Sequence, residues 1–200
     1  MSKFEVQYPK GSTPLDPNEI IGLIPDYITT QGELNSLEKE NISKAIKWSE
    51  GKNHKNLLES SFIFNLHKRM LSDVWRWAGI QRTSDKSIGV PWRHIPSQMK
   101  LLLDDTKYWI ENDTYLWKEI AARFHHRLLQ IQAFPNGNGR HARLMTEILL
   151  QQYDQPTPTW GIHKPEDTID VEGTIRDEYI RSLQEADNKF FNRLIKFMFS

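Results

Sequence analysis

The chain has 200 residues with 26 basic and 26 acidic side chains, so its formal net charge is zero. This length favours one domain with a substantial core, and the balanced charge gives no support for nucleic acid as a direct partner. The sequence contains no cysteine, which excludes disulfides, thiolate metal sites and a thiol nucleophile. No apolar run approaches membrane-spanning length, and the N-terminus lacks the apolar core of a signal peptide. A cytoplasmic protein without membrane contact is therefore expected.

The N-terminal part of the chain predicts an irregular arm followed by a helix. Prolines and glycines interrupt residues 1–29. Thr30 and Glu33 then form a capping-box pattern, which indicates a helix within residues 30–51. The apolar face of this helix is expected to contain Leu34, Leu37, Asn41, Ala45 and Trp48.

Residues 52–160 are expected to form the main part of the domain. Apolar residues at helical spacing predict a long helix from about residue 56 to residue 78, with Gly79 at its end. Further helices are predicted at 97–112, 117–131 and 140–152, and two more in a C-terminal part, 161–200.

Residues 83–95 contain the one convincing strand-like pattern in the sequence. Ile88, Val90 and Trp92 alternate around Gly89, and the proline between the last two is typical of an edge strand. The segment predicts a β-hairpin with an exposed edge, and an ordinary connecting hairpin is the alternative.

The stretch Phe-Pro-Asn-Gly-Asn-Gly-Arg-His-Ala-Arg at 134–143 joins two predicted helices. Glycine and asparagine accept positive φ angles, so the chain can turn sharply here. Such a turn points free N–H groups and the positive end of the next helix dipole at one place, where Arg140 and Arg143 add two permanent charges. The pattern predicts a polyphosphate site, with a solvated helical corner as the alternative. The expected phosphate-binding residues are Gly137, Asn138, Gly139, Arg140 and Arg143.

This stretch resembles the active-site motif of Fic-domain proteins, His-Pro-Phe-x-(Asp/Glu)-Gly-Asn-Gly-Arg-x-x-Arg, with Phe134, both glycines, Asn138 and both arginines in register. The resemblance covers nearly the whole chain and points to the Fic subgroup called mobile mystery protein B, within the Fic/Doc superfamily. It implies a single all-α Fic domain with a small β-hairpin flap at about 83–95 over an active-site motif at 132–143. The flap of such domains binds the target peptide by strand addition, a role that would fall here on Ile88, Gly89 and Val90.

The resemblance also implies an activity. Fic proteins of this kind transfer AMP from ATP to a hydroxyl of a target protein, with Mg²⁺ on the phosphates as the cofactor. The partners that the resemblance suggests are ATP or AMP, a target protein with a Ser, Thr or Tyr hydroxyl, a small helix-turn-helix companion, and a second copy of the chain in a homodimer.

Two positions of the motif depart from the family pattern. The first, a histidine that acts as the general base in the family, is Gln132 here, and Ala133 follows in place of proline. A glutamine amide is not basic, so it cannot take a hydroxyl proton as an imidazole does. The acidic position, which holds Mg²⁺ in the family, is Asn136, whose neutral oxygen is a weaker ligand than a carboxylate. The sequence therefore predicts a retained phosphate site with transfer lost or strongly impaired.

The first long predicted helix also resembles a family element. Ser36, Glu40 and Asn41 match the pattern (Ser/Thr)-x-x-x-Glu-(Gly/Asn) of the inhibitory helix in self-inhibited Fic proteins. The resemblance implies an ion pair between Glu40 and Arg143 that blocks the γ-phosphate of ATP. The alternatives are a solvated acidic face of the helix, and a pair between Arg143 and Glu147 four residues later.

Three interpretations of function remain open. The first is a Fic AMP-transferase whose base has been replaced, by natural drift or by deliberate substitution. A second is a non-enzymatic module that binds a nucleotide or a partner in the same pocket. The third is a Fic relative with altered chemistry, such as removal of AMP with Glu40 orienting the attacking water.

Overall fold

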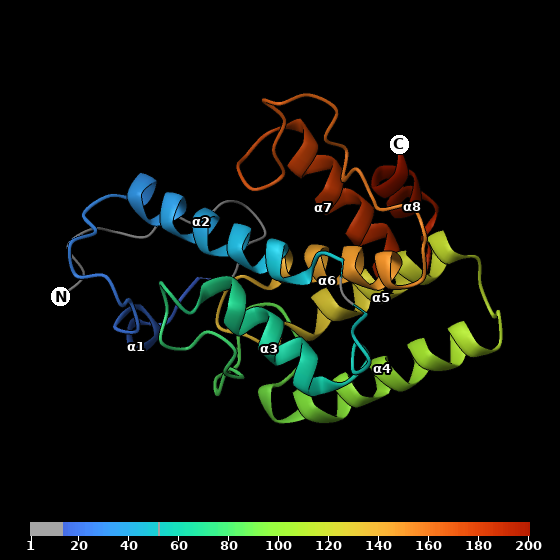
Figure 1. Cartoon of the computed structure of the whole chain (residues 1–200), viewed down its shortest axis with the longest axis horizontal. Coiled ribbons are helices and arrows are strands. Elements are labelled where there is room, and N and C mark those ends of the chain that lie inside the picture. The colour runs from blue at the N-terminus through green and yellow to red at the C-terminus, as the bar shows by residue number, and fades with distance from the viewer. Residues whose placement is uncertain (1–13, 52) are drawn as a thin grey trace.

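The structure is a computed structural model that describes residues 14–51 and 53–200 (Figure 1). Residues 1–13 of the predicted arm lie outside the described residues. The described helices, in chain order, are α1 (Pro17–Ile20), α2 (Gln31–Ser49), α3 (Ser60–Leu71), the 3₁₀ helix η1 (Trp92–His94), α4 (Ile95–Glu111), α5 (Trp117–Ile131), α6 (Asn138–Gln152), α7 (Thr174–Asp187) and α8 (Asn192–Phe199).

Helix α2 begins where the capping box predicts. The Thr30 hydroxyl accepts from the backbone N–H of Glu33 at 3.2 Å, and the Glu33 carboxylate accepts from the backbone N–H of Thr30 at 3.0 Å. These bonds satisfy two of the free groups at the helix start. The helix continues to Ser49, so the predicted bounds are confirmed to within two residues.

Helix α3 is shorter than predicted because a side chain from α2 ends it. The Asn41 amide donates to the Arg69 carbonyl at 3.0 Å and accepts from the backbone N–H of Asp73 at 2.9 Å. It thereby replaces helical partners at the end of α3. Trp75 consequently lies in an isolated bridge and Trp77 in a turn, rather than in a helix, and both are buried.

Helix α5 is central to the packing, with α7 and α8 on one side and α4 on the other (Figure 1). Phe124 and Leu128 of α5 lie in the main hydrophobic cluster, which also contains residues of α3, α4 and α6. Ala121 and Ala122 of the same helix lie in a second cluster with α7 and α8. Because α5 belongs to both clusters, the loop that follows it is fixed relative to both halves of the fold.

The predicted β-hairpin flap at 83–95 is not formed. Among the described residues there is no strand, and the only strand-like backbone contact is an isolated bridge between Leu23 and Trp75. Instead, the segment runs as irregular backbone with bends into η1, where the Asp85 carboxylate accepts from the backbone N–H of Trp92 at 2.8 Å. Alternating residues form a strand only where a partner strand supplies hydrogen bonds. Here a side chain supplies them, as described below.

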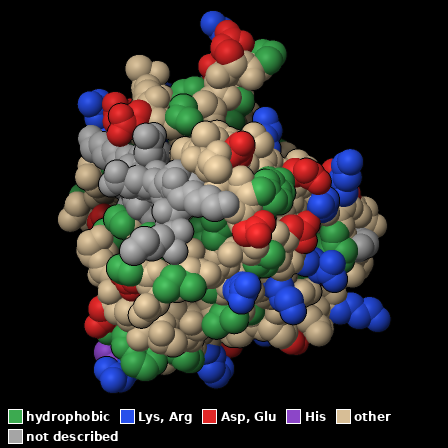
Figure 2. All heavy atoms as spheres, turned by 90° about the vertical axis from the view of Figure 1, so that its left-hand side faces the viewer, with side chains coloured by type: hydrophobic (Ala, Val, Ile, Leu, Met, Phe, Trp, Pro, Cys, Tyr) green, Lys and Arg blue, Asp and Glu red, His purple; other side chains and the backbone are tan. Residues whose placement is uncertain are grey.

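The face of the molecule in Figure 2 carries acidic and basic side chains interspersed, in keeping with the zero net charge. No helix within the described part of the chain is long and apolar enough to span a membrane.

Candidate functional site

The candidate site is built on the loop between α5 and α6. Helix α5 ends at Ile131, and Gln132 then adopts a left-handed conformation with φ 50° and ψ 59°. Few non-glycine residues adopt this conformation, which costs about 1–3 kcal/mol and persists only where the surroundings hold it. Gln132 is 5% exposed, so the position of the missing histidine is enclosed by the fold.

Asn138 and Gly137 shape the loop. The Asn138 amide donates to the Phe134 carbonyl at 2.8 Å and accepts from the backbone N–H of Phe134 at 3.0 Å, closing the turn. Gly137 caps α6 with φ 77°, and a Cβ there would lie 2.7 Å from Leu71 Cδ1. A side chain at this position would be strained and would also clash, so only glycine suits it. Gly139, by contrast, lies inside the helix, where a Cβ would meet ordinary contacts.

His67 of α3 holds the loop through hydrogen bonds and stacking. Its Nε2 donates to the Asn136 carbonyl at 3.0 Å, and its Nδ1 accepts from the backbone N–H of Gly79 at 2.9 Å. The ring stacks on Phe134 with centroids 3.7 Å apart. Burial lowers the pKa of His67 well below its ordinary value, and the neighbouring His141 acts in the same direction. His67 is thus a neutral, structural histidine.

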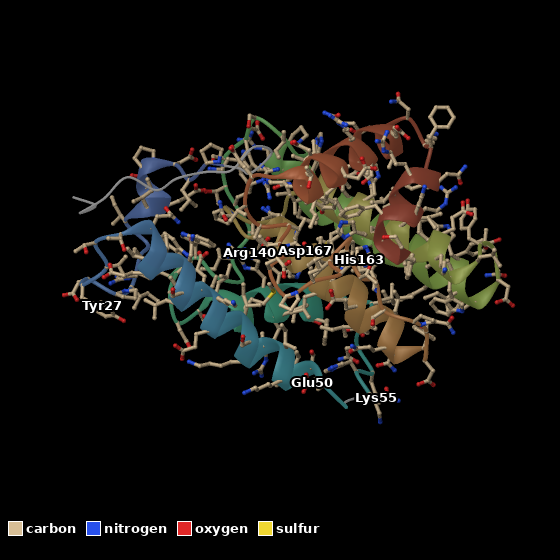
Figure 3. All side chains as sticks on the ribbon, turned by 90° about the horizontal axis from the view of Figure 1, so that it is seen from above. Tyr27, Glu50, Lys55, Arg140, His163 and Asp167 are labelled. Carbon is tan, nitrogen blue, oxygen red and sulfur yellow. The ribbon has the colours of Figure 1, made fainter. Side chains whose placement is uncertain are left out.

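Arg140 reaches from α6 to α2. Its guanidinium donates to the Glu38 carboxylate at 2.7 Å, and the other oxygen of Glu38 accepts from the Trp75 indole at 2.6 Å. Glu38 is buried, so this ion pair is shielded from water. Arg140 lies toward the centre of the molecule in the view from above (Figure 3).

Arg143 faces the C-terminal part of the chain. Its guanidinium donates to the carboxylate of Asp170, in the segment before α7, and lies 6.0 Å from the centre of the Tyr179 ring. The Tyr179 hydroxyl is also bonded to His125 Nε2 at 2.8 Å. Burial raises the pKa of Tyr179 to about 12, so its phenol stays protonated.

The predicted pair between Glu40 and Arg143 is not present. The Glu40 side chain is 63% exposed and pairs with Lys44 at 3.1 Å, outside the cleft that contains Arg143. Glu147 does not pair with Arg143 either, since its carboxylate accepts from the Trp160 indole at 2.6 Å. Burial raises the pKa of this carboxyl. The contact between α2 and the arginines comes from Glu38 and not from Glu40.

The other two residues of the predicted inhibitory pattern have local roles. The Ser36 hydroxyl donates to the Gly32 carbonyl at 2.9 Å within the same exposed helix face. Asn41 ends α3, as described above. Neither contacts the loop, and the residue of α2 that pairs with Arg140 is Glu38, which is not part of the pattern.

Arg82 holds the predicted flap segment on the loop. It is 1% exposed, and its guanidinium donates to the carbonyls of Gln132 at 2.6 Å, Ser84 at 2.7 Å and Val90. These are the bonds that take the place of a strand ladder. Gly89, with φ 105°, lies directly over the loop, where a Cβ would come 2.6 Å from the Cβ of Gln132.

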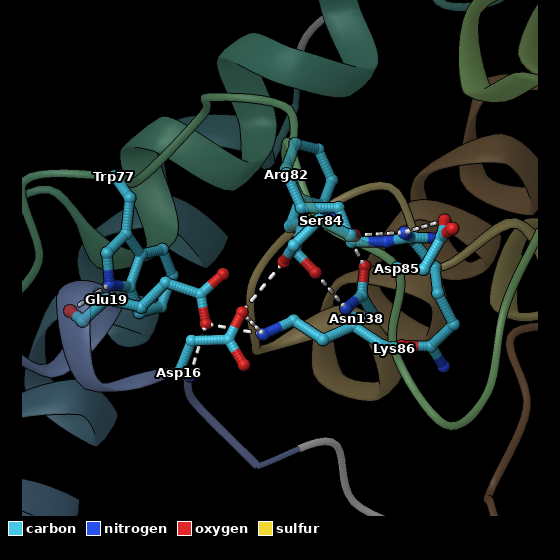
Figure 4. A network of polar contacts seen from close by, with 10 residues as sticks. Asp16, Glu19, Trp77, Arg82, Ser84, Asp85, Lys86 and Asn138 are labelled. Atoms are coloured by element: carbon cyan, nitrogen blue, oxygen red, sulfur yellow. Dashed lines mark hydrogen bonds and ion pairs between the residues drawn. The ribbon is translucent and has the colours of Figure 1, made fainter. Parts of the chain in front are cut away.

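A second set of polar contacts ties the same segment to α1 (Figure 4). The Lys86 ammonium lies between Asp16 and Glu19, at 2.8 and 2.6 Å from their carboxylates. The Ser84 hydroxyl donates to Asp16 at 2.7 Å. The predicted irregular arm therefore contains a short helix that anchors the segment over the site.

The residues present do not fit a metal ion held by protein ligands. The Asn136 side-chain oxygen, the weak Mg²⁺ ligand suggested by the sequence, accepts from the backbone N–H of Gly137 at 2.6 Å. In the part of the chain that the structure describes, no group of three His, Asp or Glu side chains is placed to bind a metal. Any Mg²⁺ would have to be bound mainly through the phosphates of a ligand.

One large cleft joins these parts. Its volume is about 1620 Å³, and it is lined by residues of α2, the segment at 87–90, the loop at 136–140, and α7. Sites for small ligands usually occupy about 300–1,000 Å³. The cleft therefore has room for a nucleotide at the loop together with part of a larger partner.

Comparison with known families identifies the central part of the chain. Residues 57–150 match the model of the Fic/DOC family. The chain is therefore similar to the Fic/DOC family over these residues, which include the flap segment and both motif arginines. The mobile mystery protein B subgroup stays a prediction. A comparison with curated protein sequences finds no match.

Solved Fic domains have a similar fold. BepC from Bartonella tribocorum, with bound AMPPNP, is 15% identical with a TM-score of 0.66, covering 86% of this chain and 87% of that one. The N-terminal Fic domain of a VirB-translocated Bep effector protein from Bartonella quintana, with bound ADP, is 14% identical with a TM-score of 0.65, covering 86% of each chain. Fic-1 from C. elegans is 21% identical with a TM-score of 0.59, covering 89% of this chain and 50% of that one. At these identities the likeness shows the helical fold alone.

Four residues of the site were not expected from the sequence. Glu38 had a signal, because Leu34, Glu38, Asn41 and Ala45 follow the spacing of one helix face and all four are buried. For Arg82 and His67 the sequence carried no such signal, since neither lies in a motif. Asp170 lies in an irregular segment, where the spacing of apolar residues does not indicate which way a side chain points.

Proposed function

We propose that the chain is a Fic-type adenylyltransferase domain that binds ATP or AMP but performs little or no AMP transfer as it stands. The observation that carries the proposal is Gln132, which occupies the position of the family's base in a site that keeps the loop and both arginines of the motif. The loop has the closed turn, the glycine cap and two arginines in one cleft. The proposal joins this geometry to the activity that the Fic resemblance implies.

The phosphates of the nucleotide would bind at the start of α6. The first turn of a helix has N–H groups without helical partners, and the dipole favours negative charge there. Arg140 and Arg143 lie three residues apart on α6, and both line the cleft. Guanidinium groups match phosphate oxygens by paired hydrogen bonds, so the two side chains suit a polyphosphate better than a single anion.

The transfer step needs a proton acceptor that the site lacks. A target hydroxyl oxygen would attack the α-phosphorus, forming a new P–O bond, while the bond to the β-phosphate breaks and pyrophosphate leaves. The hydroxyl proton must go to a base within hydrogen-bonding reach. The amide of Gln132 can accept a hydrogen bond but cannot take up the proton near neutral pH.

His126 does not replace the missing base. Among the described residues that line the cleft it is the only histidine. Its Nε2 is bonded to the Asp187 carboxylate at 2.9 Å, and the ring also bonds to the backbone of Leu183. The ring is therefore held by α7. Burial lowers the pKa of His126 further.

The second candidate function is a non-catalytic nucleotide-binding module, favoured by the same glutamine. In this alternative the domain would respond to a bound nucleotide by changing its contacts with a partner. The segment at 87–90, with Ile88 42% exposed at the mouth of the cleft, would be the nearest surface for such a partner or for a target peptide. Restoring histidine at position 132 separates the two candidates, because only the first regains transfer.

Removal of AMP with Glu40 as the water-orienting group has no geometric support, since that carboxylate lies outside the cleft.

Calorimetric titration of ATP tests the binding part of the proposal. The protein should bind ATP, and Arg140→Ala should weaken binding by about tenfold or more, because a charge-assisted contact to phosphate is lost. Arg181→Ala, an exposed arginine on α7, is the matched control and should bind as the parent does. Equal affinity of the parent and Arg140→Ala would remove the phosphate site from the account.

A further inference from the structure

Three arginines surround one carboxylate beside the phosphate loop. Asp170 accepts a hydrogen bond from Arg143 and is also attracted by Arg140 and by Arg176 of α7. Burial by itself would raise the pKa of the Asp170 carboxyl, but attraction by the three arginines outweighs it and lowers the pKa below its ordinary value. Residues from three separate parts of the chain thus meet at this point in the cleft.

Arg176 is placed against like charge. Burial lowers its pKa, and repulsion by Arg143 lowers it further. Its guanidinium donates to the Ile169 carbonyl at 2.9 Å, which holds it toward the cleft that the phosphate loop lines. Arginine stays protonated at any ordinary pH, so two positive charges remain close together.

The three arginines of the cluster face three carboxylates. Glu38 pairs with Arg140 and Asp170 pairs with Arg143, while Arg176 is attracted by Asp170 and by Glu172, which also lines the cleft. A di- or triphosphate carries several negative charges and could contact more than one guanidinium at once. Such a ligand would satisfy the cluster better than a single carboxylate does.

The Asp170 side chain can move away from Arg143 without unfolding of the segment before α7. Its side chain is 53% exposed, whereas the preceding residue, Ile169, is buried in the second hydrophobic cluster. Ile169 therefore anchors the backbone, and rotation of the Asp170 side chain alone can release Arg143 into the cleft.

We propose that Arg176 is a third arginine of the anion site and that Asp170 occupies Arg143 until a phosphate-bearing ligand displaces it. The inference rests on the proposed nucleotide binding and adds to it a ligand residue from α7 and a built-in competitor. Nucleotide binding would then depend on the C-terminal helices, outside the 57–150 segment that matches the family model.

Calorimetric titrations of ATP, inorganic pyrophosphate and adenosine test the competitor. Asp170→Asn keeps the shape of the side chain and removes its charge, so ATP and pyrophosphate should bind about two- to fivefold more tightly, the range expected for a half-exposed ion pair. Glu166→Gln removes the same charge from an exposed position in the same segment and should change neither. Adenosine has no phosphate, and its binding should not respond to either variant.

The third arginine is tested in the same way. Arg176→Gln should weaken ATP and pyrophosphate binding in both the parent and the Asp170→Asn background, and Arg176→Lys should restore part of it. Arg181→Gln, an exposed arginine on the same helix, is the control. Thermal unfolding of each variant reports whether the fold is retained.

The outcomes separate this inference from the proposed function. If Arg140→Ala weakens ATP binding while Asp170→Asn and Arg176→Gln leave it unchanged, nucleotide binding stands and this inference is wrong. It is also wrong if these variants change adenosine binding as much as ATP binding, since the effect would then be structural. If neither the parent nor Asp170→Asn binds ATP or pyrophosphate, both proposals fail.

Discussion

Glu38 of α2 holds Arg140 of α6 in a buried ion pair of 2.7 Å, and so links the first long helix to the first arginine of the Fic motif. A carboxylate in this position competes for the guanidinium and adds negative charge where phosphates would arrive. Because Glu38 also accepts from the Trp75 indole, its position is fixed by two contacts. The pair suggests that α2 restrains nucleotide binding through Glu38.

We expect Glu38→Gln to tighten ATP binding by about three- to tenfold. The amide keeps an oxygen for the Trp75 indole but loses the charge, so Arg140 becomes free to bind phosphate at a cost of about 1–3 kcal/mol in the free energy of unfolding. Glu40→Gln is the matched control from the same helix, because Glu40 lies in solvent with Lys44. Fluorescence titration with ATP and urea unfolding check both effects. Equal responses of the two variants would contradict a role for Glu38 in binding.

A second prediction concerns Gly89, which lies over Gln132. Gly89→Ala should destabilise the protein by about 1–3 kcal/mol, because φ of 105° strains alanine and its Cβ would lie 2.6 Å from the Cβ of Gln132. The control is Gly32→Ala, an exposed glycine inside α2, where alanine should raise stability by up to about 1 kcal/mol. Urea unfolding of both variants measures the difference. If Gly89→Ala leaves the free energy of unfolding unchanged, the segment is not held against the loop.

A third prediction is that stability falls as the pH decreases from about 6.5 toward 4. Burial lowers the pKa of His125 to about 3 and that of His141 to about 4, whereas both titrate near 6.5 in the unfolded chain. Between these values the unfolded state binds protons that the folded state does not. The contribution of these two histidines to the free energy of unfolding is therefore fully present above pH 6.5 and is lost as the pH falls.

Urea unfolding at several pH values from 7.5 to 5 checks this slope, which is at most about 1.4 kcal/mol per pH unit for each buried histidine. His163→Gln removes an exposed histidine and should leave the slope unchanged, whereas His141→Gln should reduce it. A slope that is the same in all three proteins would show that the buried histidines are not its source.

Local sequence signals predicted most of the helices. The capping box at Thr30 and the apolar spacing of α5 state where a helix begins and which face is buried, and both depend only on nearby residues. The end of α3 could not be predicted in this way. It is set by Asn41, which lies 28 residues before its partner Arg69.

The loop of the candidate site could be predicted because the residues that shape it are consecutive in the sequence. Gly137, Asn138 and the two arginines act within one turn and the helix that follows it. The prediction of a β-hairpin in the flap segment was wrong because a strand needs a partner strand, and here Arg82 supplies the hydrogen bonds instead. The predicted pair between Glu40 and Arg143 was wrong because the family pattern gives a spacing, whereas packing decides which side chain of α2 faces the site.

The central claim is that the site lacks transfer because Gln132 stands at the position of the family's base. Transfer of radiolabelled AMP from ATP to protein, compared between the parent and Gln132→His in the presence of Mg²⁺, tests it most directly. General-base catalysis typically contributes about a hundred- to ten-thousandfold, so the histidine variant should label protein faster by a factor in that range. Asn136→Asp in the same background shows whether a carboxylate is also needed for the metal. If neither variant labels more protein than the parent while both bind ATP, the site is a nucleotide-binding module and the claim is wrong.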